Sequence, residues 1–126
     1  MSWQLRRATP DDLDAIMAIE SSEFASDAWS SDMMSAELGD SHGYYVIAHP
    51  VGEPANVTAY AGLRAPFSSE QADIQTIAVA PEARRRGIAR ALMNALMVEA
   101  RHRGAEELFL EVRDDNPAAQ LLYDSL

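Results

Sequence analysis

One stretch in the second half of this 126-residue chain limits its fold more than any other. Residues 73–80 are rich in β-branched side chains and stop at Pro81, and an amphipathic pattern then covers residues 83–103. Gly104 ends that pattern, and residues 108–112 form another apolar strand. A strand, a helix and a strand in this order predict a right-handed parallel crossover, with the helix packed on one face of a sheet.

The remaining segments complete the predicted fold. In chain order they are a strand at 3–8, a helix from Thr9-Pro10 through Glu20, an irregular polar segment at 21–29, a short helix from Ser30 or Ser31 to Leu38, strands at 43–49 and 57–64, and a last helix from Asn116-Pro117 to Leu126. We therefore expect an α/β fold in one domain over residues 1–126. Its mixed sheet is antiparallel in the middle and parallel at the end, with helices on both faces.

The strand at 73–80 changes phase in its middle. Ile74 and Thr76 belong to one alternation, whereas Ile77 and Val79 belong to the other. A β-bulge between these pairs is predicted, because an extra residue re-aims the side chains that follow it and releases backbone amides from the ladder.

Composition narrows the function. With 48% apolar and 24% charged residues the chain is typical of a globular domain, and it has neither an apolar run long enough for a bilayer nor a secretory signal. The net charge of −10 argues against nucleic-acid binding, and the absence of Cys excludes a cysteine acyl-enzyme. We expect a cytoplasmic protein with no membrane and no nucleic-acid partner.

Four arginines nevertheless gather where the long helix is expected to begin: Arg84, Arg85, Arg86 and Arg90. A helix start carries unpaired amides and partial positive charge, and Gly87 allows an anionic group to approach the backbone. The Walker and Rossmann glycine patterns are absent. A solvated basic helix start is the alternative, but the strand, the proline and the small residues favour a site for a pyrophosphate.

Arg84, Gly87 and Ala89 match the Arg/Gln-x-x-Gly-x-Gly/Ala motif, so this segment resembles the acetyl-CoA-binding motif of the GNAT N-acetyltransferase superfamily. Other segments are similar to its RimI-type branch, which acetylates the N-terminal amine of a ribosomal protein. They are Ile19-Glu20 with Phe24 and residues 27–30, residues 110–113 with Asn116, and residues 119–126.

The resemblance implies a GNAT acyl-CoA N-acyltransferase fold, acetyl-CoA as co-substrate and no metal. Carried over residue by residue, it implies that acetyl-CoA is bound by Ile77, Ala78, Val79, Arg84, Arg85, Arg86, Gly87, Ile88, Ala89 and Asn116. Glu111 would be the general base and Tyr123 the general acid. The family continues with Gly-Phe and two more strands, so we expect C-terminal strands of the fold to be missing from residues 1–126.

The residues also support these roles by themselves. Glu111 lies beside Phe109 in an apolar strand, where burial would raise its pKa toward that of a useful base, although a solvated Glu paired with Arg113 fits equally well. Tyr123 shares a helix face with Asn116, although an ordinary half-buried Tyr is the alternative.

The predicted reaction is acetyl transfer to a primary amine by direct attack, with a basic protein N-terminus such as that of a ribosomal protein as acceptor. A small-molecule amine or a lysine remains an alternative acceptor, and a non-catalytic acyl-CoA-binding module is a second alternative. The three His residues are too scattered for a metal site. Phe24 and Trp29 are candidates for substrate contact or for the core.

Overall fold

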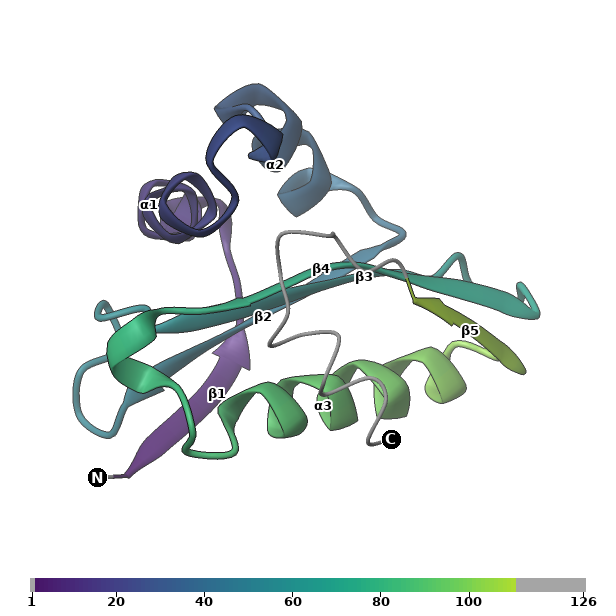
Figure 1. The fold of residues 1–126 in the computed structure, drawn as a ribbon. Helices are drawn as coiled ribbons and strands as arrows, with labels where there is room; N and C mark the ends of the chain where they lie inside the picture. The colour runs from purple at the N-terminus through teal and green to yellow at the C-terminus, as the bar shows by residue number, and fades with distance from the viewer. Residues whose placement is uncertain (1, 111–126) are drawn as a thin grey trace.

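The computed structural model describes residues 2–110, and in that part of the chain five strands form one sheet in the order β1-β2-β3-β4-β5 (Figure 1). The strands are β1 (Trp3–Arg7), β2 (Gly43–Pro50), β3 (Ala59–Arg64), β4 (Gln71–Val79) and β5 (Glu107–Leu110). The helices are α1 (Leu13–Phe24), α2 (Ser31–Gly39) and α3 (Ile88–His102). Pairing is antiparallel from β1 to β4 and parallel between β4 and β5.

The helices lie on both faces of the sheet. Figure 1 shows α1 and α2 on one face and α3 along the other. Each face has its own buried cluster, with Ile16 and Met34 beneath the first pair of helices and Leu92 and Leu96 beneath α3. This arrangement confirms the predicted mixed α/β sheet and the crossover from β4 through α3 to β5. No helix of the described residues is long and apolar enough to cross a membrane.

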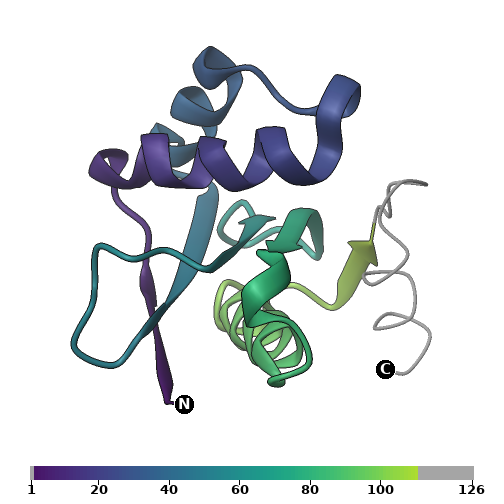
Figure 2. The same ribbon diagram turned by 60° about the vertical axis from the view of Figure 1, so that its left-hand side comes forward.

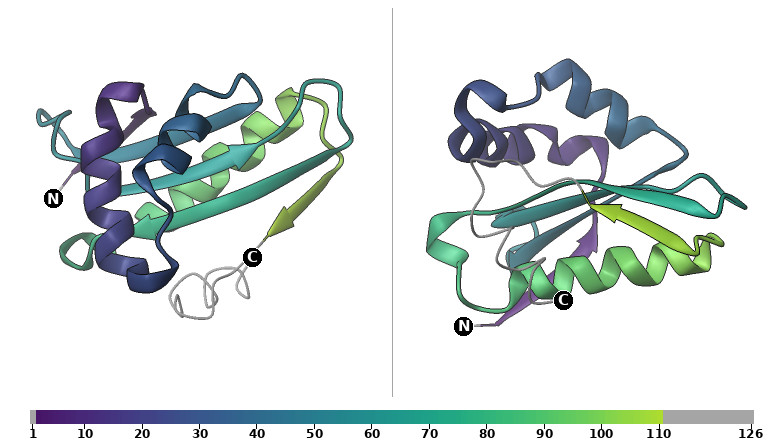
Figure 3. Two further views of the ribbon diagram at one scale, coloured as in Figure 1. Left: turned by 90° about the horizontal axis from the view of Figure 1, so that it is seen from above. Right: turned by 45° about the vertical axis from the view of Figure 1, so that its right-hand side comes forward.

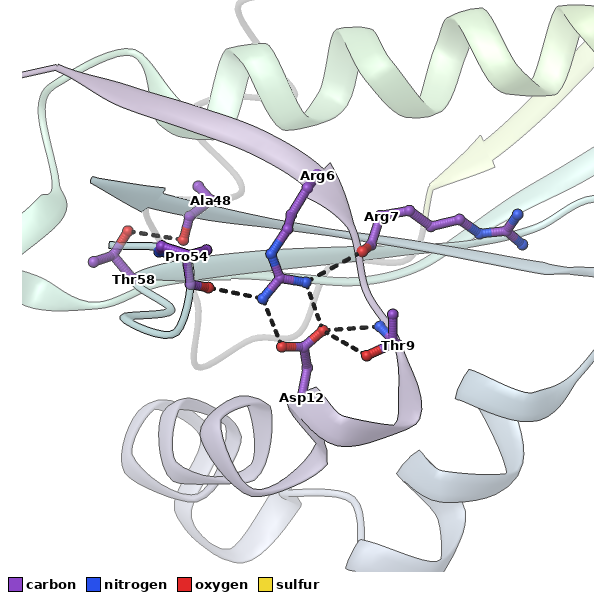
Figure 4. Close-up of polar contacts among 7 residues, drawn as sticks. All are labelled: Arg6, Arg7, Thr9, Asp12, Ala48, Pro54 and Thr58. Atoms are coloured by element: carbon purple, nitrogen blue, oxygen red, sulfur yellow. Dashed lines mark hydrogen bonds and ion pairs between the residues drawn. The ribbon is translucent and has the colours of Figure 1, made fainter. Parts of the chain in front are cut away.

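The N-terminal strand is fixed to the start of the first helix by a cluster of hydrogen bonds. Arg6 on β1 donates two hydrogen bonds of 2.8 Å to the Asp12 carboxylate and one of 2.8 Å to the Pro54 carbonyl (Figure 4). The Thr9 amide also donates to Asp12, at 2.8 Å, which fixes the 3-10 turn that leads into α1. The Arg6 guanidinium holds the pKa of Asp12 below its usual value.

Two helix boundaries predicted from the sequence are wrong. The segment expected to be irregular at 21–29 is helical as far as Phe24, because that side chain is a core residue only 1% exposed. Phe24 therefore packs in the core, and Trp29 is half-buried against the same cluster. The long helix begins at Ile88 rather than near residue 83, because residues 81–87 form a 3-10 turn and a loop.

Candidate active site

β4 contains the predicted bulge. Leu63 of β3 pairs with Ile74 and Gly62 pairs with Thr76, which leaves Gln75 as the extra residue. Before the bulge Ile74 faces the α3 cluster, and beyond it Ile77 faces that cluster while Ala78 faces α1. The bulge thus produces the change of phase read from the sequence, and the prediction is confirmed.

A tyrosine from β2 lies across this bulge. The Tyr45 hydroxyl donates to Oε1 of Gln75 at 3.1 Å, and the ring occupies the space beside Gly62. A Cβ added to Gly62 would lie 2.2 Å from the Cζ atom of Tyr45, so only glycine fits at this position. Gly62 and Tyr45 together hold the bulged residue on the face of the sheet that α1 and α2 cover.

A tight turn follows β4 and leads into α3. Arg85 and Gly87 both have positive φ, 64° and 77°, and Gly87 is the residue that caps the helix. A Cβ added to Gly87 would meet no atom within 4 Å, so the space over this residue is open. Ile88 and Ala89 are the first residues of α3, where backbone amides have no acceptor within the helix. The turn therefore offers amide donors and an accessible backbone to an anionic group.

The predicted anion-binding arginines occupy different places. Arg85 and Arg86 are exposed on the turn. Arg84 instead folds back: its Nε donates to the Val79 carbonyl at 3.2 Å, and its guanidinium forms an ion pair with Glu23 of α1. Arg84 thereby ties the turn to the end of β4 and to α1.

The edge of β4 that faces β5 lies beside this turn. β3 pairs with the other edge of β4 as far as Val79, so an extended ligand would align along the edge toward β5. The pairing of β4 with β5 reaches Ile74 and Leu110, the last residue of β5, and the two strands diverge toward that end in the view from above (Figure 3). Ile77, Ala78 and Val79 lie between this point and the turn, so the structure brings together the predicted acetyl-CoA residues from 77 to 89.

The predicted Glu111, Asn116 and Tyr123 lie outside the described residues, so their roles stay predictions. Glu111 follows Leu110 directly in the chain, and Leu110 pairs with Ile74, one residue before the bulge. The assignment of acetyl-CoA to residues 77–89 also stays a prediction. Within residues 2–110 no group of three His, Asp or Glu side chains could hold a metal ion.

Sequence reasoning missed the polar partners of this region. Glu20 is fully buried and accepts hydrogen bonds from the Tyr60 hydroxyl and from the Trp29 amide. Its place in the apolar stripe of α1, four residues after Ile16, was the signal that it is buried. Nothing in the local pattern named its partners, because Tyr60 lies 40 positions away.

Comparison with known proteins decides the family. The model of the acetyltransferase (GNAT) family matches residues 13–126. The chain belongs to the GNAT family. The resemblance read from Arg84, Gly87 and Ala89 is thereby confirmed.

Among similar proteins, N-alpha-acetyltransferase RimI of Mycobacterium tuberculosis is 36% identical over 105 residues, which cover 79% of this chain and 61% of that protein. The crystal structure of the ribosomal-protein-S18-alanine N-acetyltransferase of Escherichia coli superimposes with a TM-score of 0.81 at 28% identity, over 98% of this chain and 76% of that one. An uncharacterized protein of Mycobacterium leprae is 36% identical over 94% of this chain and 32% of its own length. The GNAT chain described here spans about a third of the length of the first curated relatives it matches.

Proposed function

We propose that this GNAT chain transfers an acetyl group from acetyl-CoA to the N-terminal α-amine of a protein, with a ribosomal protein as the acceptor class. The observation that carries the proposal is the turn at Gly87, which is left-handed, open, rich in arginine and placed between a bulged strand and a helix start. Membership of the family supports acetyl transfer. The names of the E. coli and M. tuberculosis relatives support a protein N-terminus as acceptor.

The described residues support places for the pyrophosphate and for the pantetheine arm of acetyl-CoA. The pyrophosphate is bound by the first amides of α3, where the helix dipole is positive, and by the exposed charges of Arg85 and Arg86. The extended pantetheine arm pairs with the edge of β4 from Ile77 to Val79, opposite the edge that β3 occupies. This route leads the thioester toward the bulge at Gln75.

At the bulge the neutral amine attacks the thioester carbonyl. A nitrogen–carbon bond forms and the carbon–sulfur bond breaks. Glu111 takes the proton that leaves the amine, and Tyr123 gives a proton to the departing thiolate. Backbone amides of β4 polarise the carbonyl. The chain has no Cys to carry the acetyl group, so the amine attacks directly in a ternary complex.

The pKa of the amine and the net charge of the chain both favour a protein α-amine as the acceptor. A protein α-amine has a pKa of about 7.7–8.0, whereas a lysine has a pKa of about 10.4, so more of the α-amine is neutral near pH 7. The net charge of −10 attracts a basic protein and repels a polyanion. A ribosomal protein would meet the enzyme in the cytoplasm.

Mass spectrometry after incubation with acetyl-CoA tests the acceptor class. A peptide with a free N-terminal Ala is expected to gain one acetyl group. The same peptide with a blocked N-terminus and an internal Lys, and a polyamine such as spermidine, are expected to react much more slowly. Faster reaction of the blocked peptide or of the polyamine would replace the proposal with a lysine or small-amine acetyltransferase. Tight acetyl-CoA binding without any acetylated product would indicate a non-catalytic module.

The pH profile tests the base. In the parent protein kcat/KM is expected to rise through two ionisations, one from Glu111 and one from the free amine. Glu111→Gln should lower the rate and remove the lower ionisation while acetyl-CoA still binds. Glu107→Gln is the matched control, because Glu107 is an exposed acid on β5. An unchanged profile in Glu111→Gln would show that the base lies elsewhere.

A further inference from the structure

Glu20 of α1 is a carboxylate inside the core. It is 0% exposed and lies in the same helix as the buried Ile16, Ile19 and Phe24. A carboxylate in such surroundings is costly unless strong hydrogen-bond donors surround it. A Leu or Met at this position would avoid that cost, so packing alone does not explain why a carboxylate is present.

The two oxygens of this carboxylate hold two different parts of the chain. Oε1 accepts a hydrogen bond from the Tyr60 hydroxyl of β3. Oε2 accepts one of 2.7 Å from the backbone amide of Trp29, in the segment that joins α1 to α2. Glu20 therefore links this segment, residues 25–30, to the middle of the sheet.

The joining segment needs such an anchor. Ala25, directly after α1, has φ 47° and ψ −117°, a backbone conformation that L residues rarely adopt. Unfavourable backbone conformations persist only where their surroundings hold them in place, and they gather at functional sites. The bond from Trp29 to Glu20 is one such restraint, four residues further along the chain.

The anchor lies next to the proposed acetyl-CoA site. Tyr60 pairs with Ala78 in the register of β3 and β4, and Ala78 belongs to the stretch along which the pantetheine arm is proposed to bind. In the view from above, α1 crosses the strands from the side of β1 to the side of β4 (Figure 3). Figure 2 likewise shows α1 ending over the side of the sheet where β4 and β5 lie.

We infer that the acceptor reaches the thioester from the face that α1 and α2 cover. α3 packs along β2, β3 and β4 on the opposite face and closes that approach. The bulged Gln75 is bonded to Tyr45, which belongs to the cluster beneath α1 and α2. Residues 25–30 are therefore placed to line the path of the acceptor amine.

We propose that Glu20 is a positioning residue that fixes residues 25–30 as a wall of the acceptor site. This inference rests on the proposed acetyltransferase function. Glu20 does not touch the amine, because it is buried and its oxygens are engaged by Tyr60 and Trp29. It sets the affinity for the acceptor and leaves acetyl-CoA binding unchanged.

Steady-state kinetics of Glu20→Gln tests the proposal. The amide of Gln keeps the size of the side chain but loses the charge. It has one oxygen atom, so it cannot accept hydrogen bonds from both the Tyr60 hydroxyl and the Trp29 amide. We expect the KM for the acceptor peptide to rise about tenfold, the effect of losing one charge-assisted hydrogen bond, while the Kd of acetyl-CoA changes less than about twofold. Asp14→Asn is the matched control, because Asp14 is an exposed acid of the same helix, and it should change neither value. An unchanged acceptor KM, or an equal loss of acetyl-CoA affinity, would overturn the proposal.

Amide hydrogen exchange at Trp29 gives a readout that does not depend on activity. This amide should be protected in the parent protein and in Asp14→Asn, and it should exchange faster in Glu20→Gln. Tyr60→Phe, which keeps the carboxylate and removes its bond to the Tyr60 hydroxyl, serves if Glu20→Gln fails to fold, and it should also raise the acceptor KM. Unchanged exchange in Glu20→Gln would refute the anchor itself. Absence of acetyl transfer by the parent protein to any amine would refute the proposed function instead.

Discussion

Gly62→Ala should be far more damaging than a glycine-to-alanine change in a strand usually is. The new Cβ would lie 2.2 Å from Cζ and 2.3 Å from Cε2 of the Tyr45 ring. Carbon atoms in contact normally lie about 3.5–4.0 Å apart, so the ring must move by more than an ångström. Tyr45 is 3% exposed in a packed core, and its hydroxyl bonds to Gln75, so the ring has no empty space to enter.

The cost follows from these contacts. Overpacking a core costs about 1–3 kcal/mol, and the lost hydrogen bond to Gln75 adds about 1 kcal/mol. We therefore expect Gly62→Ala to lower the free energy of unfolding by about 3 kcal/mol, a large share of the roughly 5–15 kcal/mol of a typical domain. Gly39→Ala is the control. Its Cβ would meet nothing within 4 Å, and a compatible change of this kind stabilises by about 0.4–1 kcal/mol.

Urea denaturation followed by circular dichroism gives the free energies, and a double-mutant cycle isolates the cause. In a Tyr45→Ala background the obstacle is absent, so adding Gly62→Ala should cost less than about 1 kcal/mol, and the coupling between the two positions should be about 2 kcal/mol or more. Additive effects of the two changes would refute the argument. So would a Gly62→Ala protein within about 0.5 kcal/mol of the parent.

Four further predictions concern the site and its supports. Asn and Asp both tolerate a left-handed backbone, so Gly87→Asn and Gly87→Asp differ in charge alone. Calorimetry should show acetyl-CoA binding about tenfold weaker in Gly87→Asp than in Gly87→Asn, and equal affinities would exclude a pyrophosphate at this turn. Tyr123→Phe should lower kcat by about 10²–10⁴-fold with unchanged acetyl-CoA affinity; a rate within a few-fold of the parent would leave Tyr123 a packing residue. Asp12→Asn should cost about 2 kcal/mol at pH 7 in urea denaturation. Because the pKa of Asp12 is lowered in the folded state, that difference should be present above about pH 4 and vanish as the pH falls through the folded pKa, whereas a pH-independent difference would contradict the pairing with Arg6. Ser30→Ala should remove the helix cap to Met33 and cost about 1 kcal/mol, whereas Ser31→Ala should be nearly neutral, and equal losses would refute the cap.

Local patterns sufficed for the sheet and for the bulge. The bulge could be read from Ile74 to Val79 because burial on alternate faces imposes a period of two, and a change of phase in that period marks an extra residue. The start of α3 was placed too early because Ala83 and the arginines have good helix propensity. The left-handed backbone of Arg85 and Gly87 moves the start of the helix to Ile88. It follows from the geometry of the turn, and Gly87 is its one signal in the sequence.

The polar supports of the site could not be predicted, because they join residues that are distant in the chain. Arg84 pairs with Glu23 across 61 positions, and Glu20 with Tyr60 across 40. A sequence pattern shows that Glu20 lies on a buried helix face but not which donor meets it. Arg84 illustrates the same limit: the motif predicts a phosphate ligand, and the structure shows its side chain bonded to the end of β4 and to α1.

The strand order β1-β2-β3-β4-β5 repeats the order of the chain, so each strand after β1 pairs with the strand that precedes it in the sequence. Short loops connect β2 to β3 and β3 to β4, and closing them costs little chain entropy. The antiparallel part can therefore assemble from contacts between strands that are close in the chain, whereas β5 must wait for the crossover through α3. The edge of β4 that is proposed to take the thioester can thus form before the strand that leads to the predicted base Glu111 joins it.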